Sequence, residues 1–139
     1  MSDDNKALVR EMLAGADDAD ITILDKFLGE KYDDHNPPPF QQGTGPEAVR
    51  DAFKYALNAF SDFHHEIAAQ YVDGDTVITR IVGTGKHTGE FMGVPATGQQ
   101  VSMEGIAIHR VENGKLVEHW STVDALSLMM QIGAIPAPG

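Results

Sequence analysis

The residues best suited to acid/base chemistry are His109 and Glu118, which flank the dipeptide Asn113–Gly114. Asn-Gly is the strongest signal for a two-residue β-hairpin turn. In such a hairpin Glu112 lies opposite Lys115, and counting outward places His109 opposite Glu118. An imidazole and a carboxylate on one face could transfer a proton to or from a ligand. They could equally be a hydrogen-bonded structural pair.

The same register predicts which side chains share a face of this hairpin. Because side chains alternate along a strand, the face of His109 is mostly small and apolar, and it includes Met103. Trp120 joins this face from the second strand. Apolar walls with a few polar groups are typical of a ligand pocket. The other face mixes Ile106 and Ile108 with polar residues and could be solvated or contact another subunit.

A glycine-punctuated segment, "HTGEFMGVPATGQQV" at residues 87–101, precedes the first strand of the hairpin. It carries two large apolar side chains, Phe91 and Met92, which a plain connection between strands does not need. The question is what such an apolar, glycine-rich loop covers. It could be a surface loop that packs down for stability alone.

Composition excludes several classes of function. The 139-residue chain has a formal net charge of −11, which disfavours nucleic acid and anionic membranes as partners. It has no cysteine, so disulfides, thiolate catalysis and cysteine-ligated zinc are excluded, and a cytoplasmic location is compatible with this. No segment is apolar for long enough to span a bilayer. We expect a single domain over residues 1–139.

Motifs for metal and cofactor chemistry are also missing from the sequence. The six histidines include no H-x-H or HExxH spacing, so we expect no metal site. There is no G-x-S-x-G elbow, P-loop or dinucleotide-binding glycine pattern, so we expect no cofactor.

The helices and strands that must position these residues can be predicted from the periodicity of apolar residues and from the glycine and proline residues that interrupt it. Helical spacing predicts helices that end near Gly15, over 21–30, and over 46–60, with a loop at 32–45 because of three successive prolines. Strands are expected at 64–72, 76–85, 100–111 and 115–123, followed by a short helix at 124–133. Three helices, an antiparallel meander and a final helix predict an α+β fold with helices on one face of a curved sheet.

Residues 84–133 resemble the SnoaL-like polyketide cyclase family, within the nuclear-transport-factor-2-like or ketosteroid-isomerase-like superfamily. The match is densest at "TGEFMGVPATG", "IHRVENGKLVEHW" and "VDALSLMMQIG", and "YDDHNP" near His35 also fits. The resemblance implies a cone-shaped α+β barrel, with helices packed on a strongly curved antiparallel sheet around a deep pocket whose mouth is covered by residues 87–101. It also implies an intramolecular aldol ring closure on a polyketide methyl ester, without a metal.

The resemblance assigns roles to particular residues. It implies that Asp124 of "HWSTVD" is the general acid/base and that His109 binds or polarises a carbonyl. Asp is also a preferred helix N-cap, so Asp124 has a structural alternative as the cap of the last helix. On a straight strand Asp124 would lie about 20 Å beyond Glu118, which keeps Glu118 as a rival base. We expect the substrate, a small apolar carbonyl compound, to contact the side chains of His35, Phe91, Met92, Met103 and Trp120.

Other functions on the same scaffold stay open, because a fold does not determine a function. One is a pocketed binding protein without turnover. Less favoured are an isomerase and an epoxide hydrolase; the latter would need an arginine in the pocket, and Arg110 is expected to point away from His109. The mixed outer face predicts a homodimer or homotetramer, and the resemblance implies the same, because members of the resembling family commonly form homo-oligomers.

Overall fold

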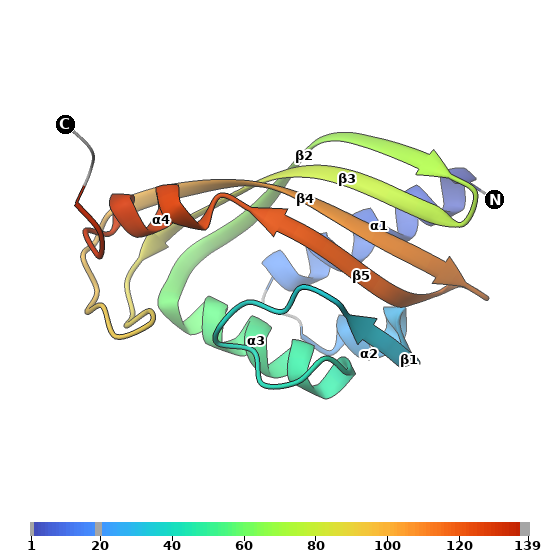
Figure 1. Cartoon of the computed structure of the whole chain (residues 1–139), viewed down its shortest axis with the longest axis horizontal. Helices are drawn as coiled ribbons and strands as arrows, with labels where there is room; N and C mark the ends of the chain where they lie inside the picture. The colour runs from blue at the N-terminus through green and yellow to red at the C-terminus, as the bar shows by residue number, and fades with distance from the viewer. Residues whose placement is uncertain (1, 19–20, 137–139) are drawn as a thin grey trace.

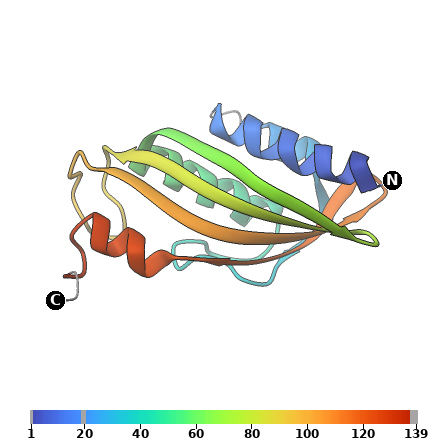
Figure 2. The same cartoon turned by 90° about the horizontal axis from the view of Figure 1, so that it is seen from above.

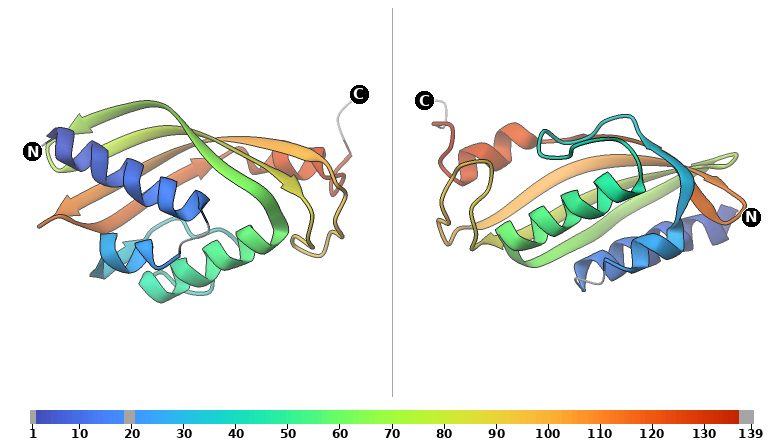
Figure 3. Two further views of the ribbon diagram at one scale, coloured as in Figure 1. Left: turned by 180° about the vertical axis from the view of Figure 1, so that it is seen from behind. Right: turned by 90° about the horizontal axis from the view of Figure 1, so that it is seen from below.

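The computed structural model describes residues 2–18 and 21–136 and has two layers, a five-stranded sheet and a set of helices (Figure 1). The helices α1, α2 and α3 lie on the same side of the sheet, as the view from below shows (Figure 3). The fourth helix, α4, follows the last strand and lies beside the first residues of the strand before that one, where Gln131 hydrogen-bonds with the backbone of Ser102. The helices are α1 (Ser2–Asp17), α2 (Ile23–Phe27), α3 (Pro46–Ala59) and α4 (Ala125–Gln131).

The two N-terminal helices differ in length from the sequence prediction. The first continues through Gly15 to Asp17, so the predicted stop at Gly15 is wrong. Gly15 is needed inside the helix because a Cβ there would approach the side chain of Ile23 to 2.8 Å. The second helix has only one turn, Ile23–Phe27, instead of the predicted ten residues. The third begins at Pro46 as expected, since proline is well suited to a first helical turn.

The sheet is mixed and open, with the strand order β1-β5-β4-β3-β2. Its strands are β1 (Leu28–Asp34), β2 (Phe60–Asp73), β3 (Thr76–His87), β4 (Gln100–Glu112) and β5 (Lys115–Val123). Strands β2 to β5 form the predicted antiparallel meander, and they are long, twisted and bent (Figure 2). The predicted curved sheet under helices is therefore confirmed, although one edge of it is parallel.

That parallel edge, β1, is an element that the sequence prediction missed. Residues 28–30 were expected in a helix and residues 32–34 in a loop. Instead Leu28 pairs with Leu116, and Asp34 pairs with His119, both on β5. Burial explains the outcome, because Leu28 and Tyr32 both enter the main hydrophobic core as strand residues. Tertiary packing overrides a weak local helical pattern here.

A β-bulge at Val117 changes the predicted register of the last hairpin. Val111 pairs with Leu116 as predicted, but Arg110 then pairs with Glu118 because Val117 is left as an extra residue. His109 consequently lies opposite His119 instead of Glu118. A one-residue shift moves every following side chain to the other face of a sheet. The register prediction was correct only for the two pairs beside the turn.

The concave side of the sheet carries most of the core. One cluster joins α1, α2, α3 and the turn end of the β4–β5 hairpin, and it includes the fully buried Leu24 and Leu116. A second cluster near the other end of the sheet contains Phe60, Phe91 and Leu128. Across the described ranges, every helix is too short or too polar to traverse a lipid bilayer.

Candidate active site

A cavity of about 640 Å³ lies between the concave face of the sheet, the helices and the loops that join them. Its walls are largely hydrophobic side chains from α1, α2, α3, the sheet and α4. The polar groups on its lining include Asp34 of β1, His109 of β4, and His119 and Ser121 of β5. An apolar cavity with a few convergent polar groups is the expected form of a small-molecule site.

Asp34 and His119 form a hydrogen-bonded pair in this cavity. His119 Nδ1 lies 3.0 Å from Asp34 Oδ1, and the two residues are paired on the neighbouring strands β1 and β5. Asp34 is only 3% exposed, whereas the His119 side chain is 18% exposed and retains access to the cavity. A carboxylate at Nδ1 directs the ring proton to that nitrogen and leaves Nε2 to face a ligand.

The carboxylate of Asp34 is held by further hydrogen bonds. The backbone N–H of Asn36 donates to Oδ1 at 3.0 Å, and Gln41 Nε2 donates to Oδ2 at 3.0 Å. Burial opposes ionisation, but the hydrogen bonds and the charge of His119 outweigh it and lower the pKa of Asp34. The carboxylate is therefore ionised at neutral pH and can stabilise positive charge on His119.

His109 stacks against His119 from the adjacent strand. The ring centroids are 4.7 Å apart, and His109 is 3% exposed. Burial, followed by the proximity of His119, lowers the pKa of His109 to about 3. Its Nδ1 is buried without a hydrogen-bond partner among the described residues. His109 is therefore a neutral imidazole that lines the cavity, and its predicted place on the pocket face is confirmed.

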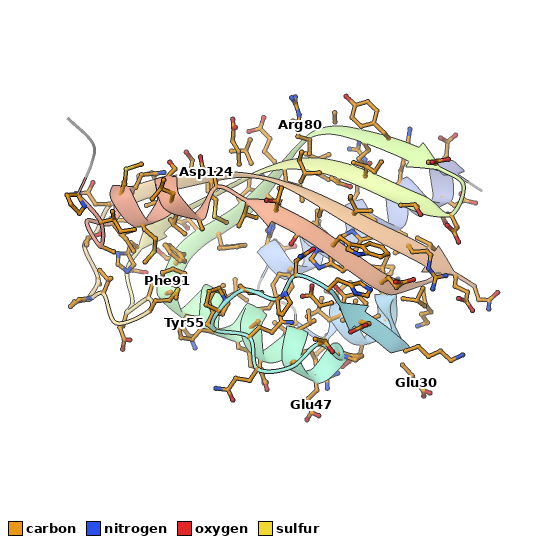
Figure 4. All side chains as sticks on the ribbon, in the orientation of Figure 1. Glu30, Glu47, Tyr55, Arg80, Phe91 and Asp124 are labelled. Carbon is orange, nitrogen blue, oxygen red and sulfur yellow. The ribbon has the colours of Figure 1, made fainter. Side chains whose placement is uncertain are left out.

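The predicted apolar contacts at the mouth also line the cavity. Phe91, Met92 and Met103 are all part of its wall. Phe91 is 5% exposed and packs against the rings of Tyr55 and Phe40, with centroids 5.9 and 5.6 Å away. Figure 4 shows Phe91 and Tyr55 together below the sheet. The loop of residues 88–99 thus covers one end of the cavity, as the sequence suggested.

Three other predicted residues lie on the opposite face of the sheet. Glu118, His35 and Trp120 are absent from the cavity wall. Glu118 accepts a hydrogen bond from Arg110 Nε at 2.6 Å, and its other oxygen lies 2.9 Å from His35 Nε2. The His35 ring stacks on Trp120 at 4.7 Å. The bulge at Val117 is the cause, because it turns Glu118 and Trp120 outward and His119 inward.

Asp124 occupies the N-cap of α4. Its Oδ1 accepts a hydrogen bond from the backbone N–H of Ser127 at 3.0 Å. It is exposed and belongs to a groove on the outer face with Arg80 and Glu104, not to the wall of the large cavity. Figure 4 shows it where β5 passes into α4, away from Tyr55 and Phe91. This is the capping arrangement that the sequence offered as the alternative role of Asp124.

Two residues of the site, Asp34 and His119, escaped the sequence prediction. Asp34 belongs to "YDDHNP", which the three prolines after it made appear to be a loop. A signal for His119 was present, because the adjacent apolar residues Leu116 and Val117 break the alternation of a regular strand. Such a break is typical of a bulge, which would have moved His119 to the pocket face.

Metal ligation finds no support in the geometry. Within residues 2–18 and 21–136, no three histidine or acidic side chains come together as a group that could hold a metal ion. The side chains of the cavity that can hydrogen-bond or transfer a proton include Asp34, His119 and His109.

Comparison with known proteins places this site in a family. The model of SnoaL-like polyketide cyclases matches residues 6–132, which is nearly the whole chain. The chain belongs to the SnoaL-like polyketide cyclase family. The resemblance seen in the sequence over residues 84–133 is thereby confirmed and extended to the N-terminal helices.

Individual members of the SnoaL-like family agree with this assignment. Aklanonic acid methyl ester cyclase DauD of Streptomyces sp. (strain C5) is 33% identical over 132 residues, which cover 91% of this chain and 80% of the relative. Nogalonic acid methyl ester cyclase of Streptomyces nogalater is 27% identical over 113 residues, covering 79% and 83%. The structure of TsrD from Streptomyces laurentii superimposes with a TM-score of 0.87 at 28% identity, covering 97% and 98%.

Proposed function

We propose that this protein is a cofactor-independent cyclase that closes a carbocyclic ring in a polyketide-like carbonyl substrate by an intramolecular aldol reaction. The observation that supports it best is the Asp34–His119 pair in a largely apolar cavity of about 640 Å³. Membership of the SnoaL-like family supports the reaction class, since the relatives are named as cyclases of polyketide methyl esters.

In the proposed reaction His119 is the general base. Its Nε2 takes a proton from a carbon that is made acidic by neighbouring carbonyl groups. The resulting carbanion attacks a second carbonyl carbon of the same molecule, which forms the new C–C bond and an alkoxide. The alkoxide then takes the proton back from His119, so the product is an isomer of the substrate. Ionised Asp34 stabilises the imidazolium that exists between the two proton transfers.

His109 is assigned a different role, donation of a hydrogen bond to the enolate oxygen. Because its pKa is about 3, the ring is neutral at working pH and does not repel the imidazolium of His119, which it contacts. Its buried Nδ1 leaves Nε2 as the nitrogen that can face a substrate. A neutral donor placed at developing negative charge lowers the barrier without taking part in proton transfer.

The test is conversion of aklanonic acid methyl ester or nogalonic acid methyl ester to a product of the same mass and a different retention time, by liquid chromatography with mass spectrometry. Wild-type protein should form the ring-closed isomer, and a folded His119→Gln variant should not. If the wild type binds the esters and leaves them unchanged, the protein is a binding protein and the proposal fails.

We propose further that the chain forms a homodimer or a larger homo-oligomer through the outer face of the sheet. Ile106 on β4 is 41% exposed there. Arg80 in the same groove makes no ion pair with another described residue, while Glu104 and Asp124 offer carboxylates. A two-fold interface could therefore pair Arg80 with an acidic residue of a second copy. A monomeric mass by light scattering at micromolar concentration would contradict this.

A cytoplasmic location is also proposed. The absence of cysteine from the sequence means that no oxidising compartment is needed for disulfide formation. Immunoblotting of fractionated cells of the source organism would test the location, and recovery in an extracytoplasmic fraction would overturn it.

A further inference from the structure

A second histidine–carboxylate pair faces the same cavity from strand β2. His65 Nδ1 lies 2.6 Å from Asp17 Oδ1, and the backbone N–H of His65 donates to Asp17 Oδ2 at 2.8 Å. Both side chains are largely buried, at 14% and 11% exposure. Asp17 thus fixes both the ring and the backbone of His65, which is more constraint than a chance surface contact provides.

The neighbouring His64 makes a useful comparison. Its Nδ1 is 3.3 Å from the same carboxylate, but the side chain is 64% exposed and takes no part in the cavity. His65 does line the cavity, and its ring packs against that of the apolar Phe63, with centroids 4.9 Å apart. No hydrogen bond is made by His65 Nε2 to any residue that the structure describes. It is therefore a free polar atom in a mostly apolar part of the wall.

His65 and His119 lie toward opposite ends of the cavity. On the sheet His65 pairs with Gly83, which pairs with Met103. Met103 is six residues before His109, which is the partner of His119. His65 and His119 are therefore separated by about 20 Å along the strand direction, before the curvature of the sheet shortens that distance. The two imidazoles cannot act on one atom, but they can contact the two ends of one elongated molecule.

We propose that His65 is a second substrate-binding residue, which accepts a hydrogen bond from a hydroxyl group at the end of the substrate remote from the reacting carbon. This deepens the proposed function and rests on it. Because Asp17 directs the ring proton to Nδ1, the neutral ring offers Nε2 as an acceptor. A phenol or enol O–H fits this atom, whereas an ether or carbonyl oxygen does not. The substrate class is then an elongated, mostly apolar polyketide with carbonyls at one end and a hydroxyl at the other.

The test compares equilibrium binding of 2-hydroxyanthraquinone with that of 2-methoxyanthraquinone by calorimetry, at a pH at which the phenol is neutral. The two probes differ in one hydrogen-bond donor, and neither requires turnover. Wild-type protein should bind the hydroxy compound about three- to tenfold more tightly, as expected for one net hydrogen bond. His65→Phe should abolish this preference while binding the methoxy compound as before, and His64→Gln should keep the preference.

Two further variants separate His65 from a purely structural role. Asp17→Asn should keep the fold but present an N–H to Nδ1, which moves the ring proton to Nε2 and reduces the preference for the hydroxyl. His119→Gln should leave the preference intact. The proposal is overturned if wild-type protein binds neither probe or shows no preference, or if the preference survives in His65→Phe. Binding is measured without ring closure, so failure of the cyclase proposal gives a different result. In that case the wild-type protein would still prefer the hydroxy probe, but it would form no ring-closed product in the turnover assay.

Discussion

His119 and Asp34 are 85 residues apart in the chain, and a hydrogen bond of 3.0 Å joins His119 Nδ1 to Asp34 Oδ1. The contact depends on two features that the chain creates separately. A short parallel strand brings Asp34 to the edge of β5, and the bulge at Val117 turns His119 into the cavity. The base of the proposed reaction is thus oriented by main-chain geometry before any ligand arrives.

Replacement of His119 by Gln should remove the general base. Turnover should fall by about a hundred- to ten-thousandfold, the usual contribution of a positioned base, with little change in melting temperature. The matched control is Glu118→Gln, the adjacent residue on the other face, which should keep near-normal kcat/KM because it touches Arg110 and His35 and not the cavity. Steady-state kinetics with a polyketide methyl ester measure both. Loss of activity in the Glu118 variant with normal activity in the His119 variant would reverse the assignment.

Asp34→Asn should reduce kcat while leaving KM nearly unchanged. The asparagine amide can donate to His119 Nδ1, which would place the ring proton on Nε2 and remove its ability to accept one. A loss on the order of a thousandfold is expected from this change of tautomer. The neighbouring Asp33→Asn is the control, since Asp33 does not line the cavity. Equal kinetics for the two variants would show that His119 does not depend on Asp34.

Stability should depend on pH through His109. Its pKa is about 3 in the folded protein and near 6.5 when unfolded, so below pH 6.5 the unfolded chain binds a proton that the folded chain does not. The free energy of unfolding should therefore fall by about 1.4 kcal/mol per pH unit as pH drops from about 6.5 toward 3. His109→Phe removes this group and should flatten the curve. Urea unfolding of both proteins at neutral and mildly acidic pH is the measurement, and parallel curves would contradict it.

Much of the fold follows from the sequence because its signals are local. The Asn113–Gly114 turn and the alternating strands beside it predict the hairpin, and Pro46 predicts the start of α3. By contrast, β1 exists because Leu28 and Tyr32 are buried by distant residues of the core. No local pattern of residues 28–34 encodes that pairing.

The site was harder to predict than the fold for a related reason. His109 was found because its neighbours alternate regularly, and its burial places it in the cavity. Glu118 was predicted to face the cavity, but His119 faces it instead. The cause is one extra residue, Val117, which moves every following side chain of β5 to the other face of the sheet. Asp124 was chosen by resemblance over the capping role that the sequence also offered, and the structure shows the cap and the exposure of its side chain.

Asp124 should prove to be a structural residue. Asp124→Ala should lower the free energy of unfolding by about 1 kcal/mol through loss of the cap to Ser127, and Asn should largely restore it. Turnover by the Asp124→Asn variant should be near normal, because its side chain is outside the cavity wall. Thermal melting and kinetics of the same samples decide the point. A stable but inactive Asn variant would return the role of base to Asp124.

The 88–99 loop should depend on a close approach at its root. The backbone N–H groups of Thr88 and Gly89 both donate to the carbonyl of Ala59, at 3.1 and 3.0 Å, and a Cβ on Gly89 would collide with the carbonyl oxygen of Asn58. Gly89→Ala should therefore displace the loop, lower the free energy of unfolding by about 1–3 kcal/mol and raise KM, since Phe91 would leave the cavity wall.

The control for the loop is Gly45→Ala, because a Cβ at Gly45 meets open space and its φ of −88° suits any residue. Urea unfolding and KM for the two variants give the comparison. If Gly89→Ala lowered the free energy of unfolding no more than Gly45→Ala did, and left KM unchanged, the loop would not be anchored through its contact with the end of α3. The covering of the cavity by Phe91 would then have to rest on its aromatic contacts with Tyr55 and Phe40 alone.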